Sequence, residues 1–228
     1  MYDIVFISYQ ELNADLNWSR LIDRFPWAKC VHGVKGIHQA HIAAAKKCFT
    51  EMFWIVDGDA EVVEEFDFCY TTEQKDFVHV WRSRNPINDL EYGYGGVKLF
   101  PRLATVNMDI TKPDMTTSIS KHFKPMPEIS NITAFNTDPF NTWRSAFREC
   151  VKLSSKVIDR QKTDETETRL SEWKLKGKDR PFGEYAIKGA HDGEAYGILN
   201  KGNVEELRKI NDFDWLSDQF NRNNNGRS

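Results

Sequence analysis

Short apolar runs and longer amphipathic stretches alternate along the first part of the chain. Residues 3–8, 29–32 and 52–56 are apolar runs bounded by polar or glycine-containing turns, which is typical of buried strands. Between them, the stretch around Trp18 and Leu21 has helical spacing, and residues 37–49 are rich in alanine. Strand, helix, strand, helix and strand in this order predict a βαβ-type parallel sheet.

The pattern becomes less regular after the third predicted strand. Residues 77–81 and 96–100 predict two further strands, and residues 101–136 predict a largely irregular segment. From Pro139 onward apolar residues recur at helical spacing, and residues 163–173 predict a second helix with an acidic first turn. We therefore expect one α/β domain over residues 1–220, followed by a disordered tail at 221–228.

Composition narrows the class of protein. Of the 228 residues 40% are hydrophobic, with no long uncharged apolar run and no secretory signal, so the sequence predicts a globular cytoplasmic protein without a membrane partner. Cysteines are few and widely spaced, which predicts neither a disulfide framework nor a zinc motif. The net charge of −3 argues against a surface that binds nucleic acid throughout, but it allows a local basic face.

Two carboxylates, Asp57 and Asp59, flank Gly58 at the end of the third predicted strand. In parallel sheets, ligands bind outside the carboxyl ends of the strands, so the loops after the first three strands are expected to face one crevice. The two preceding loops carry Ser8, Tyr9, Glu11 and residues 32–36. Carboxylates one residue apart suit a hard cation such as Mg²⁺ or Mn²⁺, and such a cation with open positions can neutralise a diphosphate.

Other phosphate and cation motifs do not fit the chain. An EF-hand loop starting at Asp57 would need glycine in place of Val62 and glutamate in place of Phe68. No GxxxxGK[ST] loop occurs, and no GxGxxG follows the first predicted strand. The alternative is that the carboxylates form only a turn, in which Gly58 supplies backbone freedom.

On these residues the chain resembles a GT-A glycosyltransferase. The resemblance rests on the Asp-x-Asp after a strand, on VKGIHQAH before it and on the glycine pair of YGYGGVKLF after it. Three further segments, RFPWAKCVHGVKGIHQAHIAAA, WRSRNPINDLEYGYGGVKL and ITAFNTDPFNTWRSAFREC, are similar to small glycosyltransferases of tailed phages that add glucose or arabinose to 5-hydroxymethylcytosine in DNA. The resemblance implies a GT-A-like, three-layer α/β/α fold with a mostly parallel central sheet and C-terminal helices. Residues 1–60 would be the nucleotide-binding half and 61–220 the acceptor and sugar half.

The resemblance also implies a metal-dependent enzyme that moves a sugar from a UDP-sugar to 5-hydroxymethylcytosine in duplex DNA. Asp57 and Asp59 would hold Mn²⁺ or Mg²⁺, with His191 as a third ligand or, alternatively, as a surface loop histidine. The residues expected to contact the donor are Ser8, Tyr9, Glu11, Lys35, Gly36, Asp57, Arg84, Asp89, Gly95 and Gly96.

Two carboxylates are hypotheses for the base that takes the acceptor proton. Asp138 is the first candidate, and its alternative role is to cap the helix that begins at Pro139. Asp114 is the second candidate. Cations recur at every fourth position along the predicted helix, a stripe that either follows DNA phosphates or is a solvated face. They are Arg144, Arg148, Lys152, Lys156 and Arg160.

Two other functions stay open at this point. A glycosyltransferase can act on a glycan, lipid or protein instead of DNA, and strong salt-dependent DNA binding would separate these cases. A non-catalytic nucleic-acid-binding protein is the other possibility, and in it residues 57–59 would be only a turn. The sequence determines neither the oligomeric state nor whether the configuration at the sugar is inverted or retained.

Overall fold

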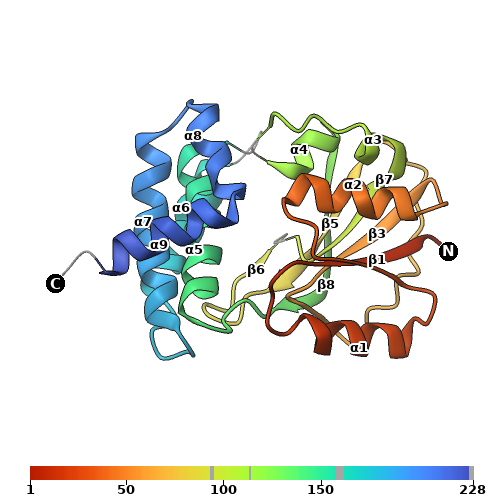
Figure 1. Cartoon of the computed structure of the whole chain (residues 1–228), viewed down its shortest axis with the longest axis horizontal. Helices are drawn as coiled ribbons and strands as arrows, with labels where there is room; N and C mark the ends of the chain where they lie inside the picture. Colours follow the sequence, from red (N-terminus) through yellow and green to blue (C-terminus); the bar gives the residue numbers. More distant parts are fainter. Residues whose placement is uncertain (93–94, 113, 158–161, 226–228) are drawn as a thin grey trace. The chain divides into compact units, whose positions relative to one another are not determined.

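A computed structural model describes residues 1–92, 95–112, 114–157 and 162–225 of the chain (Figure 1). The chain divides into two compact units. The first unit contains Met1–Asn85, Glu91–Ile110 and Met115–Ala134. The second contains Pro86–Leu90, Thr111–Asp114 and Phe135–Ser228. The predicted single domain with halves at residues 1–60 and 61–220 stays a prediction.

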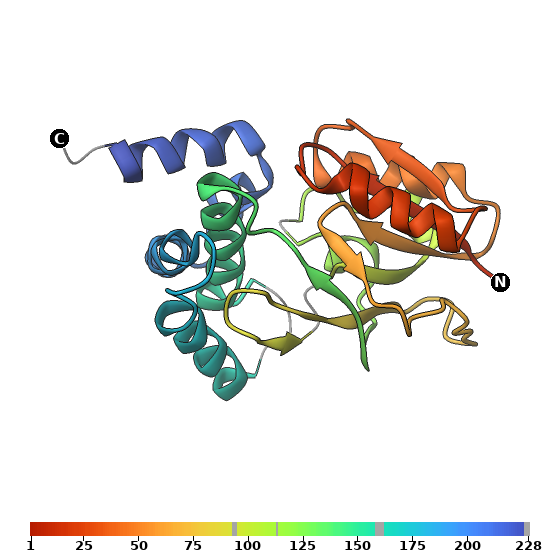
Figure 2. The ribbon, with the colours of Figure 1, turned by 90° about the horizontal axis from the view of Figure 1, so that it is seen from below.

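The first unit is built on a mixed, curled β-sheet (Figure 2). Its strands are β1 (Asp3–Ser8), β2 (Lys29–His32), β3 (Met52–Asp57), β4 (Ala60–Val62), β5 (Val78–Arg84), β6 (Glu91–Tyr92), β7 (Val97–Pro101) and β8 (Phe123–Thr133). The order is β2-β1-β3-β7-β5-β8-β4, with β6 paired to β5. The three strands predicted first, β1, β2 and β3, are parallel neighbours, which confirms the βαβ prediction for that part.

The prediction of a mostly parallel sheet is wrong for the rest. Among the described strands three pairings are parallel and four are antiparallel. Strand β7 runs between β3 and β5 and is antiparallel to both. The chain reverses direction between β5 and β6, which are antiparallel and joined by the short connection 85–90.

Helices cover both faces of this sheet. Alternate residues of β1 point to opposite sides, and each set is buried against a different helix. Ile4 and Phe6 share a core with Leu21 of α1 (Ala14–Arg24). Val5 and Ile7 share the other core with Ala44 of α2 (Ile37–Lys47). Helix α2 ends two residues before the predicted boundary. Figure 1 shows α1 and α2 on opposite sides of the strands.

The described residues between 101 and 136 are largely helix and strand, not the largely irregular segment that the sequence predicted. They form α3 (Arg102–Val106), α4 (Met115–Ile119) and the long strand β8. Strand β8 includes Pro125 and Pro127, which interrupt its apolar alternation. The register with β5 shifts after Trp81, so Pro127 lies in an irregularity where a missing amide hydrogen is tolerated.

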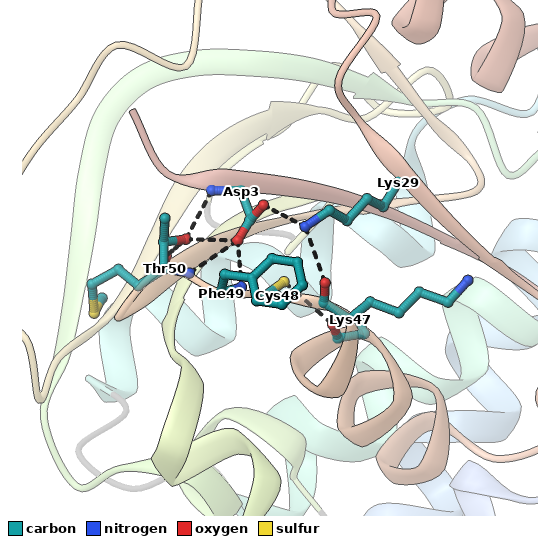
Figure 3. Close-up of polar contacts among 8 residues, drawn as sticks. Asp3, Lys29, Lys47, Cys48, Phe49 and Thr50 are labelled. Atoms are coloured by element: carbon teal, nitrogen blue, oxygen red, sulfur yellow. Dashed lines mark hydrogen bonds and ion pairs between the residues drawn. The ribbon is translucent and has the colours of Figure 1, made fainter.

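A polar cluster around Asp3 joins the amino ends of the parallel strands (Figure 3). Lys29 of β2 donates to Asp3 Oδ1 over 2.5 Å and to the carbonyl of Lys47, at the end of α2, over 3.0 Å. The backbone amides of Phe49 and Thr50 donate to Asp3 Oδ2 over 2.6 and 3.0 Å. The cluster fixes the end of the βαβ unit that lies away from Asp57.

The second unit is helical. Its elements are α5 (Pro139–Ser155), α6 (Thr163–Leu175), α7 (Gly183–Leu199), α8 (Val204–Arg208), the 3₁₀ helix η1 (Lys209–Asn211) and α9 (Phe213–Asn225). Both helices predicted here, α5 and α6, are confirmed. The core of the unit contains Trp143, Phe147, Leu207, Ile210 and Leu216.

Glycines let α7 approach α5 closely. A Cβ atom on Gly189 would clash with the carbonyl oxygen of Trp143, and one on Gly193 would clash with that of Phe147. A Cβ atom on Gly197 would likewise clash with Ser154 Oγ and with the carbonyl oxygen of Val151. The same glycines lower intrinsic helix propensity, which explains why the stretch around His191 was interpreted as a loop.

Two further features of the helices concern earlier expectations. Helix α9 continues to Asn225, so residues 221–225 of the predicted disordered tail are helical, and 226–228 lie outside the described residues. No helix in the described ranges combines the length and apolar character needed to cross a bilayer.

Candidate functional site

Five strands end at the same edge of the sheet, which we call the carboxyl edge. Strands β1, β2 and β3 run in one direction, and β7 is antiparallel to β3 and β5, so β5 runs with β3. Strand β8 is parallel to β5. The carboxyl edge therefore holds the ends of β1, β2, β3, β5 and β8 and the start of β7. The loops after the first three strands therefore leave the sheet at one edge, and the single crevice predicted there stays a prediction.

The Asp-x-Asp lies in the tight connection between β3 and β4 at this edge. Asp57 is the last residue of β3 and its amide donates to the Gly96 carbonyl over 2.9 Å. The carbonyl of Asp59 accepts from the Ala134 amide over 2.7 Å. Gly58 is buried between two half-buried carboxylates. The segment therefore does form a turn, and its backbone is held by both neighbouring strands.

Gly58 is required by close approach to the loop after β1. A Cβ atom there would lie 2.9 Å from the Ser8 Cβ and 2.9 Å from Glu11 Oε2. The buried Asn17 of α1 donates to the Gly58 carbonyl over 2.9 Å. The loop after β1 and helix α1 thus both contact this turn. Any side chain at position 58 would push the loop after β1 away from it.

The residues predicted to bind the nucleotide cluster beside this turn. Glu11 Oε2 accepts from the Tyr9 amide over 2.7 Å, and Ser8 Oγ shares a hydrogen bond of 2.9 Å with His32 Nδ1. The Gly33 amide donates to the Ser8 carbonyl over 2.9 Å. The loops after β1 and β2 are therefore tied together, as a binding site built from both loops requires.

Lysine 98 is the site residue that sequence reasoning missed. It belongs to β7 and its Nζ donates to both carboxylate oxygens of Asp57, over 2.9 Å to Oδ1 and 2.8 Å to Oδ2. Its side chain is only 6% exposed, against 31% for Asp57. The signal was present in the sequence, because a lysine inside the apolar run VKLF is rarely buried without a partner.

Gly95 packs against the side chain of Lys98 in β7, and Gly96 packs against that of Asn131 in β8. A Cβ atom on Gly96 would overlap the side chain of Asn131. Asn131 is fully buried, and its Oδ1 accepts from Ser83 Oγ over 2.8 Å and from Ser130 Oγ over 2.9 Å. No signal pointed to Asn131, because β8 was not predicted. This network supports the backbone that accepts from Asp57.

Lys35 and Gly36 lie at the start of α2, also at the carboxyl edge. Lys35 is exposed, and Gly36 precedes the first helical residue with a φ of 94°. His41, further along α2, is fully buried and its Nδ1 hydrogen bonds to the Ile37 carbonyl over 2.7 Å. Burial, and then the positive charge of Lys98, lower the pKa of His41 to about 3, so this imidazole is neutral.

Arg84 and Asp89, predicted as donor contacts, both form ion pairs. Arg84 Nη2 lies 2.9 Å from Glu91 Oε1 within the first unit. Arg180 Nη2 lies 2.9 Å from Asp89 Oδ2 within the second. Neighbouring charges therefore neutralise each residue within its own unit.

The two predicted acceptor bases belong to the second unit. Asp138 caps α5: its Oδ1 accepts from the Asn141 amide over 2.8 Å and its Oδ2 accepts from Asn141 Nδ2 over 2.5 Å. The competing role of helix cap is thus confirmed. Asp114 is buried, and Lys152 Nζ lies 3.5 Å from its Oδ1.

His191 lies on α7, not in a loop, and its side chain is exposed. Over the described ranges, no three or more His, Cys, Asp or Glu side chains gather as a metal site. The two carboxylates fit Mg²⁺ or Mn²⁺ in donor chemistry, provided that diphosphate oxygens or water complete the coordination.

The predicted basic stripe on α5 makes contacts inside the protein. Arg144 lies over the ring of Phe213 at 5.2 Å, and Arg148 Nη2 donates to Asn211 over 3.2 Å. Both arginines and Lys152 are half-buried. Lys156 is exposed and follows the last residue of α5, with a φ of 55°, so the prediction that it continues the helix is wrong. Arg160 lies outside the described residues. The stripe is thus only partly a solvent-facing surface, and its role in DNA binding stays a prediction.

Comparison with protein-family models gives no match for the chain, and comparison with curated proteins gives none either. The GT-A resemblance therefore stays a prediction, and the geometry of the carboxyl edge is the physical support for a function.

Proposed function

We propose that the protein is a metal-dependent glycosyltransferase of GT-A-like fold that uses a nucleotide-diphosphate sugar. The observation that carries the proposal is the Asp57-Gly58-Asp59 turn at the carboxyl edge, in contact with Ser8 and Glu11 from the loop after β1. Open α/β sheets bind nucleotides at such an edge, and the turn places two carboxylates there. A mixed sheet with a parallel βαβ half is compatible with this fold.

In this proposal Asp57 and Asp59 hold Mn²⁺ or Mg²⁺, which supplies positive charge for the departing diphosphate. Ser8, Tyr9 and Glu11 contact the nucleotide, as the resemblance implies, and the Tyr9 amide holds the Glu11 carboxylate in place beside the turn. Lys35, exposed at the start of α2, binds the diphosphate together with the helix N-terminus. Gly95 and Gly96 border the donor sugar, as the resemblance to GT-A glycosyltransferases implies.

For the acceptor we propose 5-hydroxymethylcytosine in phage DNA, with glucose or arabinose as the sugar. The acceptor hydroxyl attacks the anomeric carbon, and Asp138 is the first choice for the base that takes its proton, with Asp114 second. Asp114 is the weaker choice because it is buried beside Lys152. Arg144, Arg148, Lys152 and Lys156 are the proposed phosphate contacts, of which Lys156 is the most exposed.

Calorimetry with UDP and Mn²⁺ tests the donor half of the proposal. The wild type is expected to bind UDP more tightly with Mn²⁺ than without it. Asp59→Asn should abolish this metal dependence, and Asp23→Asn, at an exposed position of α1, should retain it. Metal-independent or absent binding of UDP by the wild type would remove the basis for the enzyme.

Mass spectrometry tests the acceptor half. Duplex DNA containing 5-hydroxymethylcytosine is incubated with a panel of nucleotide sugars, and unmodified DNA of the same sequence is the control. A mass gain of one sugar on the modified strand alone is expected. A protein that binds UDP with Mn²⁺ but adds no sugar to this DNA would act on another acceptor.

A further inference from the structure

The strongest anomaly of the carboxyl edge is the buried charge of Lys98. Lysine is almost never fully buried unless it is paired, and Lys98 is on a strand whose described residues are all buried. Strand β7 pairs with β3 on one side and with β5 on the other, so its backbone is fixed in the sheet. The Lys98 ammonium is therefore carried by a strand inside the sheet and not by a surface segment that could move away.

The Lys98 side chain extends toward Asp57. Its Nζ reaches both oxygens of that carboxylate, at 2.9 and 2.8 Å. A Cβ atom on Gly95 would lie 2.9 Å from Lys98 Cε, and Gly95 has a φ of 95°, a conformation suited to glycine. His41 is neutral and adds no competing positive charge.

This pairing has a consequence for the metal. A divalent cation that binds Asp57 must share a carboxylate whose two oxygens already accept from an ammonium, and it must bear repulsion from that fixed positive charge. The repulsion falls when a diphosphate brings negative charge to the same place, because the diphosphate attracts both cations. Metal and nucleotide are then expected to bind cooperatively.

We propose that Lys98 is a built-in counter-cation of Asp57, which keeps the affinity of the carboxyl edge for Mn²⁺ low until a nucleotide diphosphate is present. Lys98 acts through Asp57 and is a positioning residue. This inference rests on the proposed function in one respect, namely that Asp57 and Asp59 receive the metal.

The test is the affinity for Mn²⁺ alone, measured from the electron paramagnetic resonance signal of free Mn²⁺ without nucleotide. Lys98→Met and Lys98→Gln should each bind Mn²⁺ at least about tenfold more tightly than the wild type, since a unit charge near the metal is removed. Lys98→Gln replaces the ammonium with a neutral amide, which can still donate a hydrogen bond to Asp57. Circular dichroism checks that both variants are folded. Lys46→Gln, at an exposed position of α2, is the matched control and should leave the affinity unchanged.

A second measurement assigns the gain to Asp57. Adding Asp57→Asn to Lys98→Gln should abolish the gain in Mn²⁺ affinity, because the released carboxylate is then missing. Repeating the titration with UDP should narrow the difference between wild type and Lys98→Gln, since UDP supplies the charge that Lys98 opposes.

The outcomes separate this inference from the proposed function. Folded Lys98 variants that bind Mn²⁺ no more tightly than the wild type overturn the role of Lys98, even if UDP binding depends on Mn²⁺. A gain in Mn²⁺ affinity in a protein that binds no UDP supports the counter-cation and refutes the glycosyltransferase. Absence of Mn²⁺ binding by every variant refutes both.

Discussion

The Asp3 cluster makes a quantitative prediction about stability and pH (Figure 3). Burial alone would raise the pKa of the Asp3 carboxyl. The hydrogen bond from Lys29, those from the Thr50 and Phe49 amides, and the charge of Lys29 outweigh burial and lower the pKa from 3.8 to about 2. The Asp3 side chain is 16% exposed, so solvent screens these contacts only weakly.

The pKa difference sets the size and the pH window of the effect. At ~1.36 kcal/mol per pKa unit, the shift corresponds to roughly 2 kcal/mol of folding free energy. Because the folded-state pKa is the lower one, this stability is fully present above the unfolded pKa near 3.8 and is lost as pH falls toward 2. Asp3→Asn should therefore cost about 2 kcal/mol at neutral pH.

Urea denaturation followed by circular dichroism at several pH values measures this effect. The stability difference between wild type and Asp3→Asn should be constant from about pH 7 to 5 and should narrow below about pH 4. Asp23→Asn, at an exposed aspartate of the same unit, should show neither the loss nor the pH dependence. A difference of equal size at pH 7 and pH 3 would refute the electrostatic explanation and leave only a packing effect.

Three further predictions concern the helices and the thiols. Gly193→Ala should destabilise the protein by about 1–3 kcal/mol in thermal denaturation, because the added methyl clashes with α5. Asp138→Ala should cost about 0.5–2 kcal/mol through loss of the α5 cap, and Asp138→Ser should recover most of it. In thiol labelling of the native protein the exposed Cys69 should react first, whereas Cys48 and Cys150 should react only on unfolding. Burial, and then the Asp3 charge, raise the pKa of Cys48 to about 12, and burial raises that of Cys150 well above its usual value.

Each of these predictions has an outcome that contradicts it. Alanine is the better helix former, so Gly193→Ala would stabilise the protein if α7 did not press against α5. Equal stability of the alanine and serine variants at position 138 would deny the cap. Labelling of Cys48 at the rate of Cys69 in the folded protein would show that the core around α2 opens readily.

Local patterns in the sequence determined the first part of the protein. Strands β1, β2 and β3 and helices α1 and α2 follow from short apolar runs and helical spacing, which depend only on neighbouring residues. The position of Asp57 and Asp59 at a strand end, beside the loops of the other two strands, follows from the same local pattern. Helix α5 and its Asp138 cap were predictable for the same reason.

Tertiary structure decided what depends on residues far apart in the chain. The antiparallel placement of β7 brings Lys98 to Asp57 across 41 positions, and β8 brings Asn131 under Gly96. No local periodicity encodes a strand's direction or its neighbour, because both are set by which apolar faces can be buried together. The glycines of α7 lower helix propensity locally and are stabilised only by contact with α5, so that helix too was a property of the fold.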